Sequence, residues 1–448
     1  MEKKEQEPSP FQVIRHNAAG IDIASTMHFV AIPQGRAEQC VRKFGSFTQD
    51  LHEMAKWLKE FKIDTVAMES TGVYWIQPYL ILEEYGFDMF LVNAREIKHV
   101  PGRKSDVKDC QWIQQLHSCG LLKKSFQPDE MIRELRTYVR QRKNLVHGRS
   151  SQVLLMQKAF DQMNIKLHNV ISDITGKTGM QIIDAILNGE RNAEVLAEFK
   201  DERIKASKED IVKSLEGIWR NDNLFELRQA YELYQVIGDK IADCEKQIES
   251  TLIHIVEAGV TEPKNTKRKA RGSSKSKLDF NATKYLEAIF GVDLTEIFGI
   301  SEISVTEILA ETGTDILKWP TEKNFTSWLN LAPNINKSGG KALKGKRSKR
   351  KNKAGQAFLM AASTLKASHN WLGEFYRRIK AKQGSAVAVK ATARKLAVIF
   401  YRMIKDKVAF SPIPIEEYSM KFKERKLKYL HKQAAMLGFQ LAVREGVS

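Results

Sequence analysis

The sequence lacks the features of a membrane or secreted protein. None of its apolar runs reaches ~18 residues, the length that crosses a bilayer, and the N-terminal segment MEKKEQEPSP has no signal-peptide core. The four cysteines, Cys40, Cys110, Cys119 and Cys244, show neither CxxC nor Cys/His spacing. This argues against a zinc site and a disulfide framework. These absences predict a cytoplasmic protein without a membrane partner.

What the sequence has in surplus is positive charge. Its 448 residues include 72 Lys and Arg against 54 Asp and Glu, a formal net charge of +18. This surplus predicts a polyanionic partner, most simply nucleic acid, and binding that weakens with salt. An anionic membrane surface is the competing partner for this charge, and of the two we expect nucleic acid and no membrane. The length is that of two or three domains, and the composition is that of an ordinary globular protein.

The order of patterns in residues 18–124 predicts an α/β domain. Three short β-rich runs, GIDIAS, MHFVAIP and CVRKFGSF, precede an amphipathic helix over 48–61. A strand TVAMES, a helix over 74–85, a strand FDMFLV and a further helix follow. This is the element order of a RuvC-like, or ribonuclease-H-like, fold.

Four acidic residues stand where a carboxylate needs a partner. Asp22 lies within the first strand and Glu69 ends the fourth, while Asp106 and Asp109 share one face of the last helix. Singly, each has an ordinary role at a strand edge or a helix start. Together they predict a divalent-metal site, because a metal ion removes the cost of burying carboxylates and stabilises a reacting phosphate. The basic residues expected to face phosphate beside them are Arg103, Lys104 and Lys108.

Residues 125–258 are predicted to be a helical coiled-coil region for oligomerisation. Two long amphipathic patterns there favour an antiparallel or an intermolecular pair of helices. The basic residues of the first pattern either form a solvated face or contact nucleic acid: Arg133, Arg136, Arg140, Arg142, Lys143 and Arg149. Residues 259–280 are predicted to be a basic linker.

Residues 281–410 are predicted to be a mostly α-helical domain, followed by a charged helical tail over 411–448. Within this domain Ser338 precedes two glycines, which permit close backbone approach. A serine among cations can attack a phosphodiester, although Ser-Gly-Gly is also an ordinary loop. The basic residues expected to bind nucleic acid here are Lys341, Lys344, Lys346, Arg347, Lys349 and Arg350.

Several segments occur in the order found in one transposase family. They are GIDIAS, AMESTGVYW, VNAREIKHVPGRKSDVKD, LLKKSFQPDE, IKLHNVISDITGKTG, ILAETGTDILKWP and NKSGGK. The chain resembles the DEDD transposases of the insertion-sequence "one-ten" family, "eleven-eleven" subgroup. It departs mildly from that subgroup at Ser105 and Cys110, and it has Gly339 where the subgroup often has alanine.

The resemblance implies an RNA-guided serine recombinase. Asp22, Glu69, Asp106 and Asp109 would hold Mg²⁺ or Mn²⁺, and Ser338 would form a transient phosphoserine link to DNA. The serine and the metal site would come from different protomers of a homo-oligomer, a dimer of dimers. A structured guide RNA, the bridge RNA, would pair with donor and target DNA. The resemblance also implies a prokaryotic protein that is nucleoid-associated when active.

Two other functions fit the same residues. A RuvC-like, metal-dependent junction nuclease would use the carboxylates with water and no covalent intermediate, which would make Ser338 a loop residue. A basic scaffold with a decayed metal site would bind nucleic acid without reacting. The presence of all four acidic residues argues against the scaffold, and we expect the recombinase.

Overall fold

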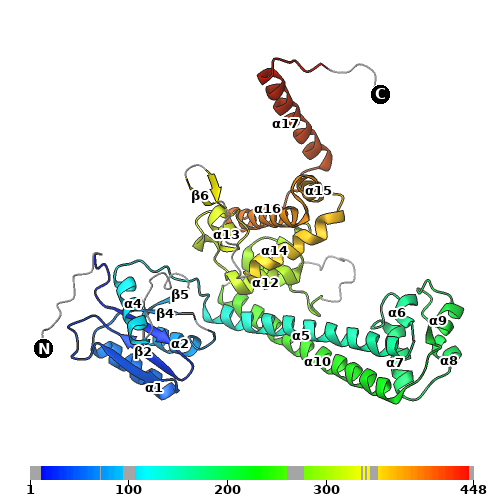
Figure 1. The fold of residues 1–448 in the computed structure, drawn as a ribbon, viewed down its shortest axis with the longest axis horizontal. Coiled ribbons are helices and arrows are strands. Elements are labelled where there is room, and N and C mark those ends of the chain that lie inside the picture. Colours follow the sequence, from blue (N-terminus) through cyan, green and yellow to red (C-terminus); the bar gives the residue numbers. More distant parts are fainter. Residues whose placement is uncertain are drawn as a thin grey trace. The chain divides into compact units, whose positions relative to one another are not determined.

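The chain forms two compact units, Met1–Gln127 and Pro128–Ser448 (Figure 1). The computed structural model describes residues 12–70, 72–93, 106–259, 277–333, 336–338, 341–343 and 352–442. At Asp106, 336–338 and 341–343 it describes the backbone alone. Most of the predicted basic linker therefore lies outside the described residues.

A five-stranded sheet in the order β3-β2-β1-β4-β5 forms the centre of the first unit. β1 to β3 are antiparallel, whereas β4 and β5 run parallel to β1. The predicted element order of the mixed α/β unit is confirmed. The elements are β1 (Ala18–Ile23), β2 (Met27–Ala31), β3 (Val41–Gly45), α1 (Thr48–Glu60), β4 (Thr65–Glu69), α2 (Ile76–Glu84), β5 (Asp88–Val92) and α4 (Asp106–Ser118).

The two faces of this sheet have different covers because side chains alternate along each strand. On one face, Ile21 of β1 and Met68 of β4 join the core formed with α1 and α2. On the other face, Ala67 and Val92 pack against Ile113 of α4. A sheet that is buried on both sides explains the nearly continuous apolar runs of β1 and β4.

Two long helices, α5 (Glu130–Gln162) and α10 (Asn221–Ala258), form an antiparallel pair in the second unit (Figure 1). Arg142 and Glu245 form a buried ion pair between them, and further along the pair the guanidinium of Arg149 lies 4.3 Å from the ring of Tyr234. The antiparallel pairing is thus found within one chain. A coiled-coil geometry and an intermolecular role stay predictions. At the far end lie α6 (Leu167–Val170), α7 (Lys177–Leu187), α8 (Ala193–Ala197) and α9 (Lys208–Leu215).

The rest of the second unit is a helical body around an aromatic core. The rings of Phe358 and Phe400 lie 5.4 Å apart, and those of Phe325 and Tyr401 lie 5.7 Å apart. The elements are α11 (Thr283–Phe290), η1 (Leu294–Glu296), α12 (Glu302–Thr312), η2 (Ile316–Lys318), α13 (Glu322–Trp328), β6 (Asn336–Ser338), β7 (Lys341–Leu343), α14 (Lys353–Thr364), η3 (Leu365–Ala367), α15 (Trp371–Gln383), α16 (Ser385–Asp406) and α17 (Ile415–Met436). Among the described residues, no helix is long and apolar enough to span a membrane.

Candidate active site

The pairing of two parallel strands brings Asp22 and Glu69 side by side. The register pairs Ile21 of β1 with Met68 of β4, so the next step along both strands places Asp22 beside Glu69. Neighbouring strands lie about 4.8 Å apart, and paired residues point to the same face. Glu69 shares the face of Ala67, which packs on α4. Both half-buried carboxylates therefore leave the carboxyl ends of their strands on the side of α4.

The helix α4 packs on β1 at a glycine. A Cβ on Gly20 would lie 2.3 Å from the amide nitrogen of Gln114 and 2.5 Å from the carbonyl oxygen of Cys110. Only glycine permits the two backbones to approach this closely. The Gln114 side chain also donates a hydrogen bond of 3.2 Å to the carbonyl of Ala18. This contact brings the first turns of α4 to the end of β1, where Asp22 lies.

The thiol of Cys110 lies near acids of both the strand and the helix. Burial raises its pKa to about 12, and the negative charges of Asp22 and, more weakly, Asp109 contribute to the rise. Charges act on one another over several ångströms, so both carboxylates lie within electrostatic reach of this thiol. Asp106 lies one turn earlier on the same helix face. The protonated thiol is a poor nucleophile and a poor metal ligand.

Carboxylate oxygens are the ligands that Mg²⁺ and Mn²⁺ prefer. Asp22, Glu69 and Asp109 are therefore suitable in kind and come from three neighbouring elements. Among the residues with described side chains, no group of three or more His, Cys, Asp or Glu is arranged to hold a metal ion. The side chain of Asp106 is not among them. A four-carboxylate ligand set thus stays a prediction that fits the described positions.

His117 holds the far end of α4 on the sheet. Its Nε2 and the hydroxyl of Thr65 lie 2.8 Å apart, and its ring centroid is 4.5 Å from that of Phe90. The Thr65 hydroxyl donates to the carbonyl of Asp88, so Nε2 of His117 carries the proton in their hydrogen bond. Burial, and then the charge of Arg15, lowers the pKa of His117 to about 4.

We predict that the first unit loses stability as the pH falls from about 6.5 to about 4. The unfolded chain protonates His117 near pH 6.5 and the folded chain only near 4. The stabilisation is therefore complete above the unfolded pKa and is lost as the pH falls through the folded pKa. The whole shift corresponds to roughly 3 kcal/mol.

Denaturant unfolding between pH 4 and 7, with hydrogen exchange of the α4 amides as the probe, measures how the stability of the first unit depends on pH. The variant His117→Gln should show a shallower slope. His28, another buried histidine with a lowered pKa, should supply part of the pH dependence that remains in this variant. An unchanged slope in the variant would show that His117 does not titrate as described.

Ser338 is the last residue of β6 and pairs with Lys341 of β7. The segment that carries this hairpin begins and ends at one place. The side chain of Asn352 donates a 3.0 Å hydrogen bond to the carbonyl of Trp328 and accepts one of 2.9 Å from the amide of Gly355. Asn352 thus joins the end of α13 to the start of α14, so the two ends of the segment between these helices lie together.

The structure describes only some of the basic residues that are predicted to bind nucleic acid. Lys108 is exposed on the first turn of α4. Lys341 lies in β7, where the backbone alone is described. The others lie outside the described residues: Arg103, Lys104, Lys344, Lys346, Arg347, Lys349 and Arg350.

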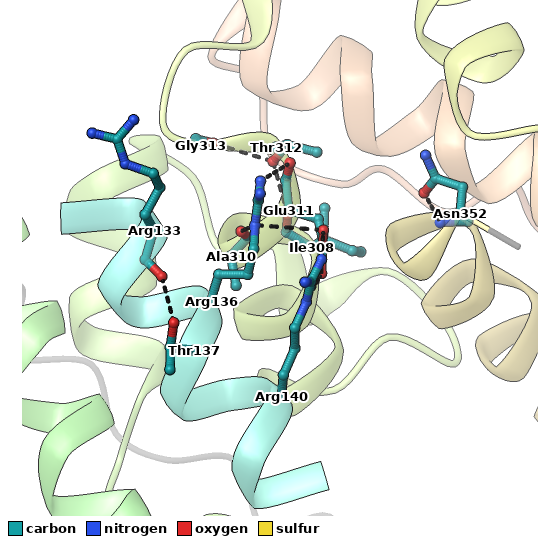
Figure 2. A network of polar contacts seen from close by, with 11 residues as sticks. Arg133, Arg136, Thr137, Arg140, Ile308, Ala310, Glu311, Thr312, Gly313 and Asn352 are labelled. Carbon is teal, nitrogen blue, oxygen red and sulfur yellow. Dashed lines mark hydrogen bonds and ion pairs between the residues drawn. The ribbon is translucent and has the colours of Figure 1, made fainter. Parts of the chain in front are cut away.

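Two arginines of α5 bind the end of α12 (Figure 2). Arg136 donates to the carbonyl oxygens of Ala310, at 2.9 Å, and Glu311. Arg140 donates to both carboxylate oxygens of Glu311, each at 2.9 Å. In the free protein both side chains form contacts within the chain, which the helical pattern of the sequence did not indicate. They attach the long helix to the body that carries Ser338.

The sequence did not indicate the roles of four residues that support the site: Gly20, His117, Glu311 and Asn352. Asn352 had a readable signal, because asparagine is a preferred N-cap residue and a helical pattern follows it. The other three act through contacts with residues that are distant in the sequence. No local pattern marks them.

Two protein-family models match parts of the chain. A DEDD transposase family matches residues 19–165, and a domain of this kind fits the ribonuclease-H-like order of strands and helices in the first unit. Domains of this class typically use divalent metal ions. The family described as "Transposase IS116/IS110/IS902 family" matches residues 293–377. The chain belongs to the IS110 family of insertion-sequence transposases. No curated protein matches it.

Proposed function

We propose that this protein cleaves and exchanges DNA strands of its insertion sequence under the guidance of a structured RNA. The carboxylates of Asp22, Glu69, Asp106 and Asp109 would form the metal site, and Ser338 would be the nucleophile. The observation that carries the proposal is the register of β1 and β4. It sets two acidic residues side by side at the strand ends on the side where α4 begins.

The chemistry follows from the properties of these groups. Mg²⁺ or Mn²⁺ held by the carboxylates would supply Lewis-acid stabilisation of negative charge on the phosphate oxygens. Ser338 Oγ would form a bond to phosphorus while the bond from phosphorus to one sugar oxygen breaks. The serine hydroxyl loses its proton and the released sugar oxygen gains one, so protons balance. Strand joining would reverse these steps with a different sugar hydroxyl.

The partners are proposed to be DNA, a guide RNA and further copies of the chain. The net charge of +18 supports polyanionic partners, and the resemblance to the bridge-RNA subgroup supports RNA guidance. Large apolar side chains that stay exposed on α5 and α10 support a homo-oligomer, which we propose to be a dimer of dimers. They are Leu154, Leu155, Leu233 and Val236.

A hydrolytic RuvC-like junction nuclease is the second candidate. It is favoured by the position of Asp22, Glu69, Asp106 and Asp109 within one unit, which would suffice for cleavage by water. Both candidates require the same carboxylates. They differ in whether DNA becomes covalently attached to protein.

Metal-dependent cleavage tests the carboxylate site. We expect Glu69→Gln to lower cleavage of matched donor DNA roughly 100-fold or more, because it removes an anionic ligand. Removing divalent metal with a chelator should have the same effect on the wild type. Asp88→Asn is the matched control, because Asp88 lies at the opposite end of the sheet in an exposed pair with Lys124. Cleavage by Glu69→Gln at the rate of Asp88→Asn would refute the site.

A further inference from the structure

The junction of α5, α12 and α14 holds more positive than negative charge. α5 contributes Arg136, Arg140 and Lys143, and the first residue of α14 contributes Lys353. The carboxylates facing them in α12 are those of Glu307 and Glu311. Four cations therefore meet two anions.

Both carboxylates are already engaged by residues of α5. Arg140 uses the two oxygens of Glu311, each at 2.9 Å (Figure 2). Lys143 uses the two oxygens of Glu307, at 2.9 and 3.0 Å. Arg136 donates to backbone carbonyls at the end of α12, where the helix dipole is negative, and its Nε lies 3.6 Å from a carboxylate oxygen of Glu311. The ion pairs of these two acids are therefore with cations of α5, and Lys353 is not among their partners.

Lys353 forms no ion pair within the part of the chain that the structure describes. Its pKa is lowered, first because protein atoms remove part of its hydration, and then because of the charge of Arg140. The carboxylate of Glu311 opposes this shift, while Lys143 and Arg136 add to it. A cation that is crowded by other cations gains from an anion that binds beside it.

The position of Lys353 indicates which anion binds beside it. It follows Asn352, whose side chain binds the carbonyl of Trp328 and so holds together the two ends of the segment that carries Ser338. Lys353 is also exposed, so that a phosphate can reach it. Arg140 and Lys143 are each about two-fifths exposed beside it.

We propose that Lys353, with Arg140 and Lys143 beside it, binds a backbone phosphate of the DNA strand that Ser338 attacks. Lys353 is a positioning residue in this proposal, because it holds the strand at the base of the serine hairpin. The choice of the attacked DNA strand as the ligand rests on the proposed function of Ser338. The prediction of a phosphate site rests on the charge surplus alone.

The test compares Lys353→Gln with Lys366→Gln. Lys366 is an exposed lysine of η3 in the same helical body, and it forms no ion pair among the described residues. The probes are a labelled duplex of the element's donor DNA and a single-stranded RNA of equal length. Fluorescence anisotropy at several salt concentrations gives Kd and its salt dependence.

We expect Lys353→Gln to weaken DNA binding roughly three- to tenfold and to reduce the salt slope by about one, as for loss of one phosphate contact. Lys353→Arg should restore both. Lys366→Gln should change neither the affinity nor the salt slope. All variants should have the same Tm as the wild type. RNA affinity should be unchanged in Lys353→Gln.

Two results would overturn the proposal. DNA binding by Lys353→Gln equal to that of Lys366→Gln would show that no phosphate binds there. A loss confined to the RNA probe would show that the phosphate belongs to RNA. These readouts need no catalysis, so failure of Ser338 as a nucleophile would be recognised separately, by the absence of a covalent DNA adduct in the wild type.

Discussion

Replacing Gly20 with valine is expected to separate α4 from the sheet and to abolish metal-dependent cleavage. The added Cβ would lie 2.3 Å from the amide nitrogen of Gln114 and 2.5 Å from the carbonyl oxygen of Cys110. Both are backbone atoms of α4, so no side chain can move aside to relieve the clash. Overpacking of this kind typically costs 1–3 kcal/mol, and we expect about 3 kcal/mol or more here.

Hydrogen exchange of the α4 amides, together with cleavage of donor DNA, measures both consequences. Asp109 lies in the first turn of the same helix, so displacement of α4 also moves this carboxylate relative to Asp22. Gly148→Ala is the control, because its Cβ would meet only Ile237 Cδ1, at 3.8 Å. In the middle of α5 that change should be neutral or stabilising, by roughly 0.5–1 kcal/mol. Wild-type exchange and activity in Gly20→Val would contradict the described contact.

The strands and helices of the first unit were predictable because their signals are local. β-rich runs and turn residues mark β1 to β5, and apolar spacing marks α1. From the sequence alone, the proximity of Asp22 and Glu69 is only a hypothesis. It depends on the register between two strands that are separated by a strand pair and a helix. A shift of one residue would have placed one of them on the other face.

The partners of the basic residues on α5 were not predictable from the sequence. A solvated arginine, one that binds nucleic acid and one that binds a distant carboxylate look alike in a helical pattern. Arg140 meets Glu311 across 171 positions of the chain. The two long amphipathic patterns left a similar choice, since an apolar stripe does not say whether its partner lies in the same chain. The pairing of α5 with α10 within this chain resolves part of that choice.

Ser338→Ala is expected to abolish covalent attachment of DNA to the protein. Loss of a nucleophile commonly costs far more than about a thousandfold in rate, because no other group can form the same bond. DNA and RNA binding should persist, since the substitution removes one hydroxyl and no charge. Ser327→Ala is the matched control, because Ser327 is an exposed serine of α13 in the same helical body.

Trapping this adduct is the most direct test of the recombinase. The wild type is incubated with Mg²⁺, labelled donor DNA, target DNA and the non-coding RNAs that flank the element, then denatured and separated by size. The proposed function predicts labelled DNA joined to wild-type and Ser327→Ala protein, and none joined to Ser338→Ala. Cleavage by the wild type without any adduct, or an adduct that persists in Ser338→Ala, would contradict it.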